Sequence, residues 1–203
     1  MHQGLQHDAS VSQSPLALDV QPYESLMGHL ITKIRVSRCF PGLRPTDGIA
    51  QIGGVRIGCK LGRSGVASRK HEGDGATPRG EYTILEGYFR SDRLRRPRTS
   101  IYLKATKLSD GWCDDPSSFQ YNRPVKLPSR RRHERLSLAE HVYDIVLVTS
   151  HNVRPRTLGA GSAIFVHLRQ SDGRATQGCI AFSLEDIRRF LPRLSARPRL
   201  LIY

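Results

Sequence analysis

Short runs of apolar and β-branched residues, separated by Gly, Pro, Asn or Asp, recur along the chain from about residue 31. Runs of this length between turn-forming residues are typical of β-strands. They predict seven strands, at 31–36, 55–61, 81–86, 143–149, 163–168, 178–182 and 199–203. The first 30 residues are polar and show little periodicity, which predicts a tail rather than packed structure.

One segment has the periodicity of a helix instead. Its apolar positions recur with helical spacing at Leu184, Ile187, Phe190 and Leu191. Ser183 precedes this stripe and Asp186 follows three residues later, which is the pattern of a capped helix start. Pro192 fits its end, so the pattern predicts a helix over 184–192.

Seven short strands with one or two helices predict a mainly β fold. We expect a β-sandwich or mixed sheet, or alternatively a flattened barrel, with one or two helices packed on it. The domain would span 31–203 and follow a tail at 1–30. Within it, the segment 88–140 has no clear periodicity and is rich in arginine. A long irregular segment inside a compact domain is usually functional.

The net charge of +14 comes from 32 Lys and Arg against 18 Asp and Glu, and residues 1–30 contain no Lys or Arg. A surface this basic attracts a polyanion, such as a nucleic acid or an anionic wall polymer. A nucleic-acid-binding protein is one interpretation, but aromatic residues make up only 7% and no nucleic-acid motif is present, so we expect no nucleic-acid partner.

The chain has no apolar run approaching the roughly 18 residues of a membrane helix, so no transmembrane segment is expected. Its start has no basic n-region and no apolar h-region of a secretory signal. These features predict either a cytoplasmic protein or an export route that the sequence does not display.

The cysteines are Cys39, Cys59, Cys113 and Cys179. They form no CxxC pair and no cluster with zinc-ligand spacing, so no metal site is expected. A Cys39–Cys59 disulfide and four free thiols both remain open.

Cys179 follows Gly178 at the end of the polar loop 169–177 and opens a predicted strand. His167 lies twelve residues earlier, near the end of another predicted strand, on the same face as Ala163 and Phe165. A strand, a turn and a returning strand would bring the two side chains together. An adjacent imidazole lowers the pKa of a thiol and handles its proton, so the pair is a candidate for nucleophilic catalysis.

A purely structural interpretation of Cys179 and His167 competes with the catalytic one. A single cysteine in a strand is usually a small core residue, and a single strand histidine is usually hydrogen bonded inside the core. The same interpretation holds for Cys59 and Cys113.

The run Thr176-Gln177-Gly178-Cys179, with His167 upstream, resembles the motif of the YkuD-type L,D-transpeptidases. Further segments resemble a branch of this family in the same order along the chain: 62–65, 72–80, 111–116, 121–123 and 161–165. The chain departs from the usual motif in three ways. Gln177 stands in place of a second histidine, Ala181 in place of a polar residue, and the spacer after His167 is short.

The resemblance implies a β-sandwich with a cradle around a catalytic cysteine, and no cofactor. By position in the motif, Cys179 would be the nucleophile and His167 the general base and then acid. The backbone N–H groups of Gly178 and Cys179 would bind the oxyanion, and Thr176 would supply the hydroxyl of the motif. The carbonyl of Leu168 is a candidate to orient His167.

The resemblance also implies the substrates. Cys179 would attack a bond in a donor stem peptide of peptidoglycan, and an acceptor stem would resolve the thioester. The cross-link would be of the 3,3 or the 1,3 type. Water as acceptor would make the protein a carboxypeptidase or endopeptidase. Such an enzyme, expected to be a monomer, would work in the periplasm or cell envelope of a Gram-negative bacterium.

Six residues are candidates for substrate binding: Trp112, Tyr121, Asn122, His151, Arg174 and Gln177. For Trp112, Tyr121 and Asn122, packing within a loop explains the pattern equally well, and for His151 a turn does. The arginine runs at 93–98 and 130–135 are typical of solvated faces or of carboxylate binding. The segment 77–80 is predicted to be a turn.

Overall fold

The computed structural model describes residues 30–39 and 44–203. The predicted tail at 1–30 therefore lies outside the described residues, apart from Leu30. The main strands are β1 (Ile31–Arg38), β2 (Asp47–Ile52), β3 (Val55–Lys60), β6 (Gly80–Phe89), β11 (Ile145–Thr149), β12 (Phe165–Leu168), β13 (Ile180–Phe182) and β14 (Leu194–Ile202). Shorter strands are β4 (Val66–Ala67), β5 (Thr77–Pro78), β7 (Leu103–Ala105), β8 (Asp110–Cys113), β9 (Arg123–Lys126) and β10 (His133–Arg135).

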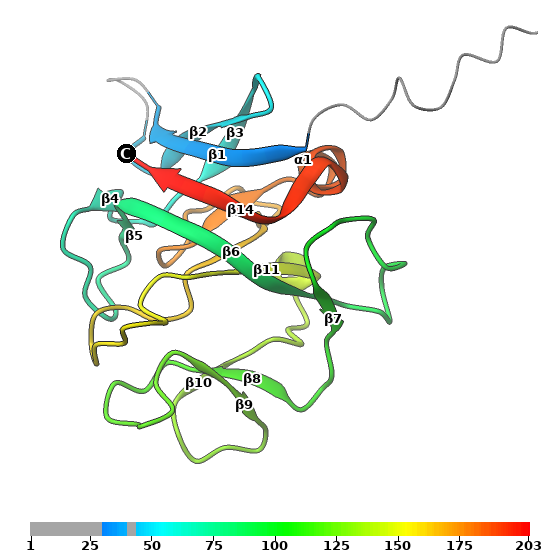
Figure 1. The fold of residues 1–203 in the computed structure, drawn as a ribbon. Helices are drawn as coiled ribbons and strands as arrows, with labels where there is room; N and C mark the ends of the chain where they lie inside the picture. The colour runs from blue at the N-terminus through cyan, green and yellow to red at the C-terminus, as the bar shows by residue number, and fades with distance from the viewer. Residues whose placement is uncertain (1–29, 40–43) are drawn as a thin grey trace, which may run out of the picture.

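Eight of these strands form a closed ring. The order is β11-β12-β13-β3-β2-β1-β14-β6, and β6 pairs with β11 to close it, while β7 adds to the edge of β6. The weakest seam lies between β13 and β3, where Ala181 and Lys60 are the only paired residues. The bridge between Gly62 and Thr176 continues this seam. The mainly β fold predicted from the sequence is thus confirmed (Figure 1).

All seven predicted strands overlap a strand of the structure, but β2 was missed, although it pairs with both β1 and β3. The segment 88–140 is largely irregular as predicted, yet it also contains β7, β8, β9 and β10. The predicted turn at 77–80 is instead the short strand β5, paired with β4, followed by the start of β6.

The helix α1 (Leu184–Phe190) starts at its predicted cap. The N–H of Asp186 donates to the Ser183 hydroxyl at 3.0 Å, which satisfies one of the free donors at a helix start. Ile187 and Phe190 are buried against the barrel. The last residues of the predicted helix belong to a separate 3₁₀ turn, η3 (Leu191–Arg193), because Pro192 has no N–H to continue the α-helix.

The strands β11, β12 and β13 are buried on both faces. Alternate residues of β11, such as Leu147, face the main core inside the barrel, while their neighbours, such as Val148, belong to a second apolar cluster on the outer face. This explains why β11 reads as an unbroken apolar run rather than as an alternating one.

A small sheet covers the outer face. Its strand order is β10-β8-β9, and it lies at the end of the molecule opposite β1 and α1 (Figure 1). Trp112 of β8 packs its ring edge-on against Phe165 of β12, with centroids 5.2 Å apart. The 3₁₀ turn η2 (His141–Tyr143) adds Val142 and Tyr143 to the same cluster. A narrow space therefore separates the outer face of the barrel from the small sheet.

All four cysteines are free thiols, which resolves the question left open for Cys39 and Cys59. In the described part of the chain, none of the helices has the length and apolar character needed to cross a bilayer.

Candidate active site

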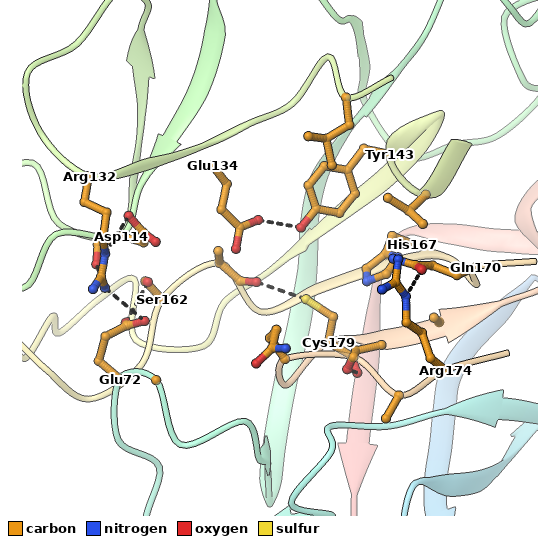
Figure 2. Close-up of a pocket in the computed structure, with 18 of the residues that line it drawn as sticks. Glu72, Asp114, Arg132, Glu134, Tyr143, Ser162, His167, Gln170, Arg174 and Cys179 are labelled. Carbon is orange, nitrogen blue, oxygen red and sulfur yellow. Dashed lines mark hydrogen bonds and ion pairs between the residues drawn. The ribbon is translucent and has the colours of Figure 1, made fainter. Parts of the chain in front are cut away.

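A cavity of about 520 Å³ opens between the outer face of β12–β13 and the small sheet. Cys179 and His167 both line it, together with residues from the loop before β13 and from β10. Figure 2 shows Cys179 near the middle of this cavity, with His167 beside it. The structure therefore brings the two residues expected to carry chemistry to one cavity.

The two strands that hold this pair run parallel, so the prediction of a returning strand was wrong. Val166 lies opposite Ile180, and His167 lies opposite Ala181. In this register, side chains at 167, 179 and 181 project from the same face, while Val166 and Ile180 point into the main core. The loop 169–177 carries the chain back to the start of the strand. Cys179 and His167 thus line one cavity because of the register between two parallel strands, and not because a hairpin joins them.

Backbone groups hold the thiol of Cys179. It donates to the carbonyl oxygen of Ala163 at 3.1 Å and accepts from the N–H of Phe165 at 3.3 Å. Burial raises the pKa of this thiol to about 12, and the charge of Glu134 adds to the shift, while the N–H of Phe165 and Lys70 oppose it. The expected lowering of the thiol pKa is therefore wrong for the protein without substrate.

The imidazole of His167 is oriented as the resemblance implied. Its Nδ1 lies 2.8 Å from the carbonyl oxygen of Leu168, and a carbonyl can only accept, so Nδ1 carries the proton. The ring packs edge-on against Tyr143, with centroids 5.2 Å apart. Burial lowers the pKa of His167 to about 4, against the backbone hydrogen bonds at Leu168 and Val142. A neutral imidazole and a neutral thiol are thus the resting pair.

A tight turn delivers Cys179 to the cavity. The hydroxyl of Thr176 donates to the carbonyl oxygen of Cys179 at 2.7 Å and accepts from the N–H of Gly178 at 3.1 Å. Gly178 has φ +134°, and a Cβ there would lie 2.7 Å from the carbonyl oxygen of Ala76. Only glycine fits this position. Because its N–H already donates to Thr176, binding an oxyanion at Gly178 requires exchange or sharing of that hydrogen bond.

Comparison with protein families identifies the architecture. The model of the YkuD family, described as the L,D-transpeptidase catalytic domain, matches residues 49–202. The chain belongs to the YkuD family. The matched range contains Cys179, His167 and every residue described above around the cavity. A comparison with curated proteins finds no match.

Four residues predicted to bind substrate lie outside the walls of the cavity in this YkuD domain. Trp112, Tyr121 and Asn122 are buried, with exposed fractions of 4%, 0% and 3%. The ring nitrogen Nε2 of His151 lies 3.1 Å from the carbonyl oxygen of Ala160, within a turn. The structure thus assigns all four to packing and support, because their polar groups are directed at neighbouring loops.

Asn122 has the most extensive supporting contacts. Its Oδ1 accepts from Trp112 Nε1 at 2.9 Å and from the N–H of Ala163 at 3.1 Å. Its Nδ2 donates to the carbonyl oxygens of His151 and Asn152. Ala163 in turn accepts the thiol hydrogen bond of Cys179. Asn122 therefore fixes the backbone that positions the sulfur.

Arg174 and Gln177, by contrast, do line the cavity, at its exposed rim. The guanidinium of Arg174 donates to the side chain of Gln170 and lies 3.4 Å from Asp172. Gln177, which stands in place of the second histidine of the motif, accepts from the guanidinium of Arg63. Both remain candidates for substrate contact.

The cavity has further polar walls. Arg132 belongs to the arginine run at 130–135 that was a candidate for carboxylate binding, whereas sequence reasoning missed Lys70, Glu72, Asp114, Glu134 and Ser162. In Figure 2, Glu72, Asp114, Arg132 and Ser162 lie on one side of Cys179, and His167, Gln170 and Arg174 on the other. Glu72 is held at Oε2 by the hydroxyls of Tyr121 (2.5 Å) and Ser162 (2.7 Å). Its segment, 72–80, carries part of the resemblance, but nothing in the sequence indicates that Glu72 lines the cavity with Cys179.

Within residues 30–39 and 44–203, no three His, Cys, Asp or Glu side chains are grouped as metal ligands would be. Several acids of the cavity pair with a base instead. Arg132, for example, lies 3.2 Å from Asp114 and 3.6 Å from Glu72. The chemistry to be explained is therefore that of a thiol, an imidazole and a charged wall.

Proposed function

We propose that this YkuD protein is a peptidoglycan L,D-transpeptidase that forms a thioester between Cys179 and a donor stem peptide. The observation that carries the proposal is that Cys179 and His167 lie on one face of two adjacent parallel strands and line the same cavity. A thiol, an imidazole held in one tautomer and a cavity open to solvent are the parts that acyl transfer requires.

The first half of the reaction begins from the neutral pair. When a donor peptide displaces water from the cavity, His167 takes the proton of the thiol, and the sulfur attacks the carbonyl carbon of the scissile bond. The C–S bond forms, the C–N bond breaks, and the imidazolium returns the proton to the leaving amine. Because the resting thiol is neutral, this design limits reaction with unrelated electrophiles.

The developing oxyanion needs donors directed at the carbonyl oxygen. The N–H groups at Gly178 and Cys179, at the turn fixed by Thr176, are our candidates. Substrate binding would have to draw the N–H of Gly178 away from the Thr176 hydroxyl.

In the second half, an amine of an acceptor stem attacks the thioester, and the cross-link forms as the C–S bond breaks. The cross-link is of the 3,3 or 1,3 type. The rim residues Arg174 and Gln177 are placed to contact the stems. Because peptidoglycan is built outside the cytoplasmic membrane, we propose that the protein works as a monomer in the periplasm of a Gram-negative bacterium, where its basic surface favours an anionic wall.

The test uses purified protein with muropeptides of defined stem length, and mass spectrometry of every product. The wild-type protein is expected to give dimers, with tandem spectra that locate the new bond as 3,3 or 1,3. Cys179→Ala is expected to give none, whereas Cys39→Ala, which removes a thiol that does not line the cavity, retains dimer formation. Dimers from Cys179→Ala would overturn the proposal.

Acyl-enzyme formation is a second measurement. Incubation with a carbapenem is expected to add the mass of the opened antibiotic to the peptide that contains Cys179. Cleavage of the donor with water as the only acceptor would show a carboxypeptidase or endopeptidase that uses the same thioester.

A further inference from the structure

Glu134 is a carboxylate in the same cavity as the nucleophile. It lies in the middle of β10, opposite Trp112 of β8, so the small sheet holds it in place. Its side chain lines the cavity together with Cys179 and His167. In Figure 2 the carboxylate reaches toward Tyr143, across the cavity from Cys179. The small sheet thus brings an acidic group to the reaction centre.

The two oxygens of this carboxylate are in different situations. Oε2 accepts a hydrogen bond from the hydroxyl of Tyr143. For Oε1, no donor is found among the residues that the structure describes. The nearest guanidinium, that of Arg132, is directed at Asp114 and Glu72 instead. Tyr143 therefore orients the group and leaves one oxygen free for a ligand.

The surroundings of Glu134 favour a cation. Burial raises its pKa, the hydrogen bond from Tyr143 lowers it, and the charges of Asp114 and Glu72 raise it further. An ionised carboxylate in such a place gains free energy when a positive group enters beside it. Its raised pKa also makes it a better proton acceptor than an exposed carboxylate.

We propose that Glu134 binds the ammonium group of the acceptor substrate through Oε1 and takes its proton before the amine attacks the Cys179 thioester. The inference rests on the proposed function, because only acyl transfer to an amine requires such a group. It assigns the acceptor as a primary amine that arrives protonated.

The proton transfers balance with this assignment. The acceptor ammonium gives one proton to the Glu134 carboxylate and becomes a neutral amine. The amine nitrogen forms a bond to the thioester carbon, and the C–S bond breaks. The second proton of that nitrogen passes through His167 to the departing sulfur, which restores the thiol, and Glu134 returns its proton to solvent.

Glu134 and His167 handle different protons for a physical reason. The neutral imidazole of His167, with its pKa near 4, is a weak base toward an ammonium ion, and it is needed for the sulfur. A carboxylate supplies both attraction for the cation and a site for its proton. Water carries no charge and is not drawn to the carboxylate as an ammonium ion is, so Glu134 favours the amine over water as acceptor.

The test compares wild-type protein with Glu134→Gln, which keeps the shape of the side chain and its bond to Tyr143 but removes the negative charge. The measured quantity is the ratio of cross-linked dimer to hydrolysed donor at a fixed acceptor concentration. This ratio is formed from one common acyl-enzyme, so changes in the rate of acylation cancel. Glu134→Gln is expected to lower it about tenfold or more, the size of a lost charge-assisted hydrogen bond.

Two controls sharpen the result. Glu185→Gln removes one negative charge from an exposed position on α1 and is expected to keep the wild-type ratio. Hydroxylamine, which is largely uncharged at pH 7.5, should resolve the Glu134→Gln thioester at the wild-type rate, because it needs neither attraction nor deprotonation.

The outcomes separate the two proposals. An unchanged dimer ratio in Glu134→Gln, or an equal loss with hydroxylamine, overturns the role of Glu134 and leaves the proposed function standing. Failure of the wild-type protein to form any thioester at Cys179 overturns both.

Discussion

The thiol of Cys179 donates its hydrogen bond to the backbone carbonyl of Ala163, 3.1 Å away. Ala163 itself has a positive φ of 50°, and its N–H donates to Asn122. The thiol is therefore held by a strained segment of backbone, and the side chain of Asn122, distant in sequence, holds that segment in place.

Asn122→Ala should slow acylation and destabilise the fold together. It removes the acceptor for Trp112 and Ala163, and it places alanine at a φ of 53°. Each buried group left unsatisfied costs about 1–3 kcal/mol. Urea unfolding and the rate of carbapenem acylation measure the two effects. Gln51→Ala, at an exposed position on β2, should change neither.

Cys179 should react slowly with small alkylating agents at neutral pH. Burial raises its pKa to about 12, so the thiolate fraction of the folded protein rises about tenfold for each pH unit up to that value. Iodoacetamide labelling followed by peptide mass spectrometry measures the rate at each cysteine, and the partly exposed Cys39 should label first. Rapid labelling of Cys179 in folded protein at pH 7 would instead demonstrate a thiolate–imidazolium pair.

Acid should destabilise the protein through His167. Its pKa is about 4 in the folded state against an ordinary value of 6.5, so below pH 6.5 the unfolded chain binds a proton that the folded protein does not bind. The contribution of His167 to the free energy of unfolding is fully present above pH 6.5. As the pH falls toward 4, the free energy of unfolding decreases by roughly 3 kcal/mol. Denaturant unfolding of wild-type and His167→Gln protein over this range measures the difference. If the free energy of unfolding fell with pH equally steeply in the two proteins, the imidazole of His167 would not be buried and neutral in the folded state.

Gly178→Ala should impair both the stability and the activity of the protein. The position has φ +134° and no room for a Cβ beside Ala76, and such backbone strain costs of order 1–3 kcal/mol. Gly58 on β3 provides a matched control, because a Cβ there meets nothing within 4 Å. Thermal unfolding and acylation rates should separate the two variants, and wild-type activity in Gly178→Ala would refute the steric argument.

The strands of the barrel could be read from the sequence because most of them combine apolar residues with clear turn signals. Position in a strand also placed His167 and Phe165 on one face, since alternation needs no tertiary information. The parallel pairing of β12 and β13 could not be read in this way. A connection of eleven residues permits a hairpin as readily as a short crossover, and the choice depends on β3 closing the barrel at Lys60.

The small sheet could not be predicted from the sequence for a different reason. Its strands are only three or four residues long and carry Arg, Lys, Pro and His, so no alternation is visible. Glu134 therefore looked like one more solvated residue within a basic run. For Asn122, a place in the irregular segment allowed either a binding groove or loop packing, and only the structure shows that its side chain bonds loop backbones.

The closed barrel and the small sheet differ in how freely they can vary. His167 takes its register from β12, which has a paired neighbour on each edge, and Cys179 directly precedes β13, which pairs with β12. The opposite wall of the cavity comes from a three-stranded insert that has no part in closing the ring. Substitutions in that insert, those of Asn122 apart, can therefore change the shape and charge of the cavity wall while the barrel strands keep the register that sets the sulfur and the imidazole.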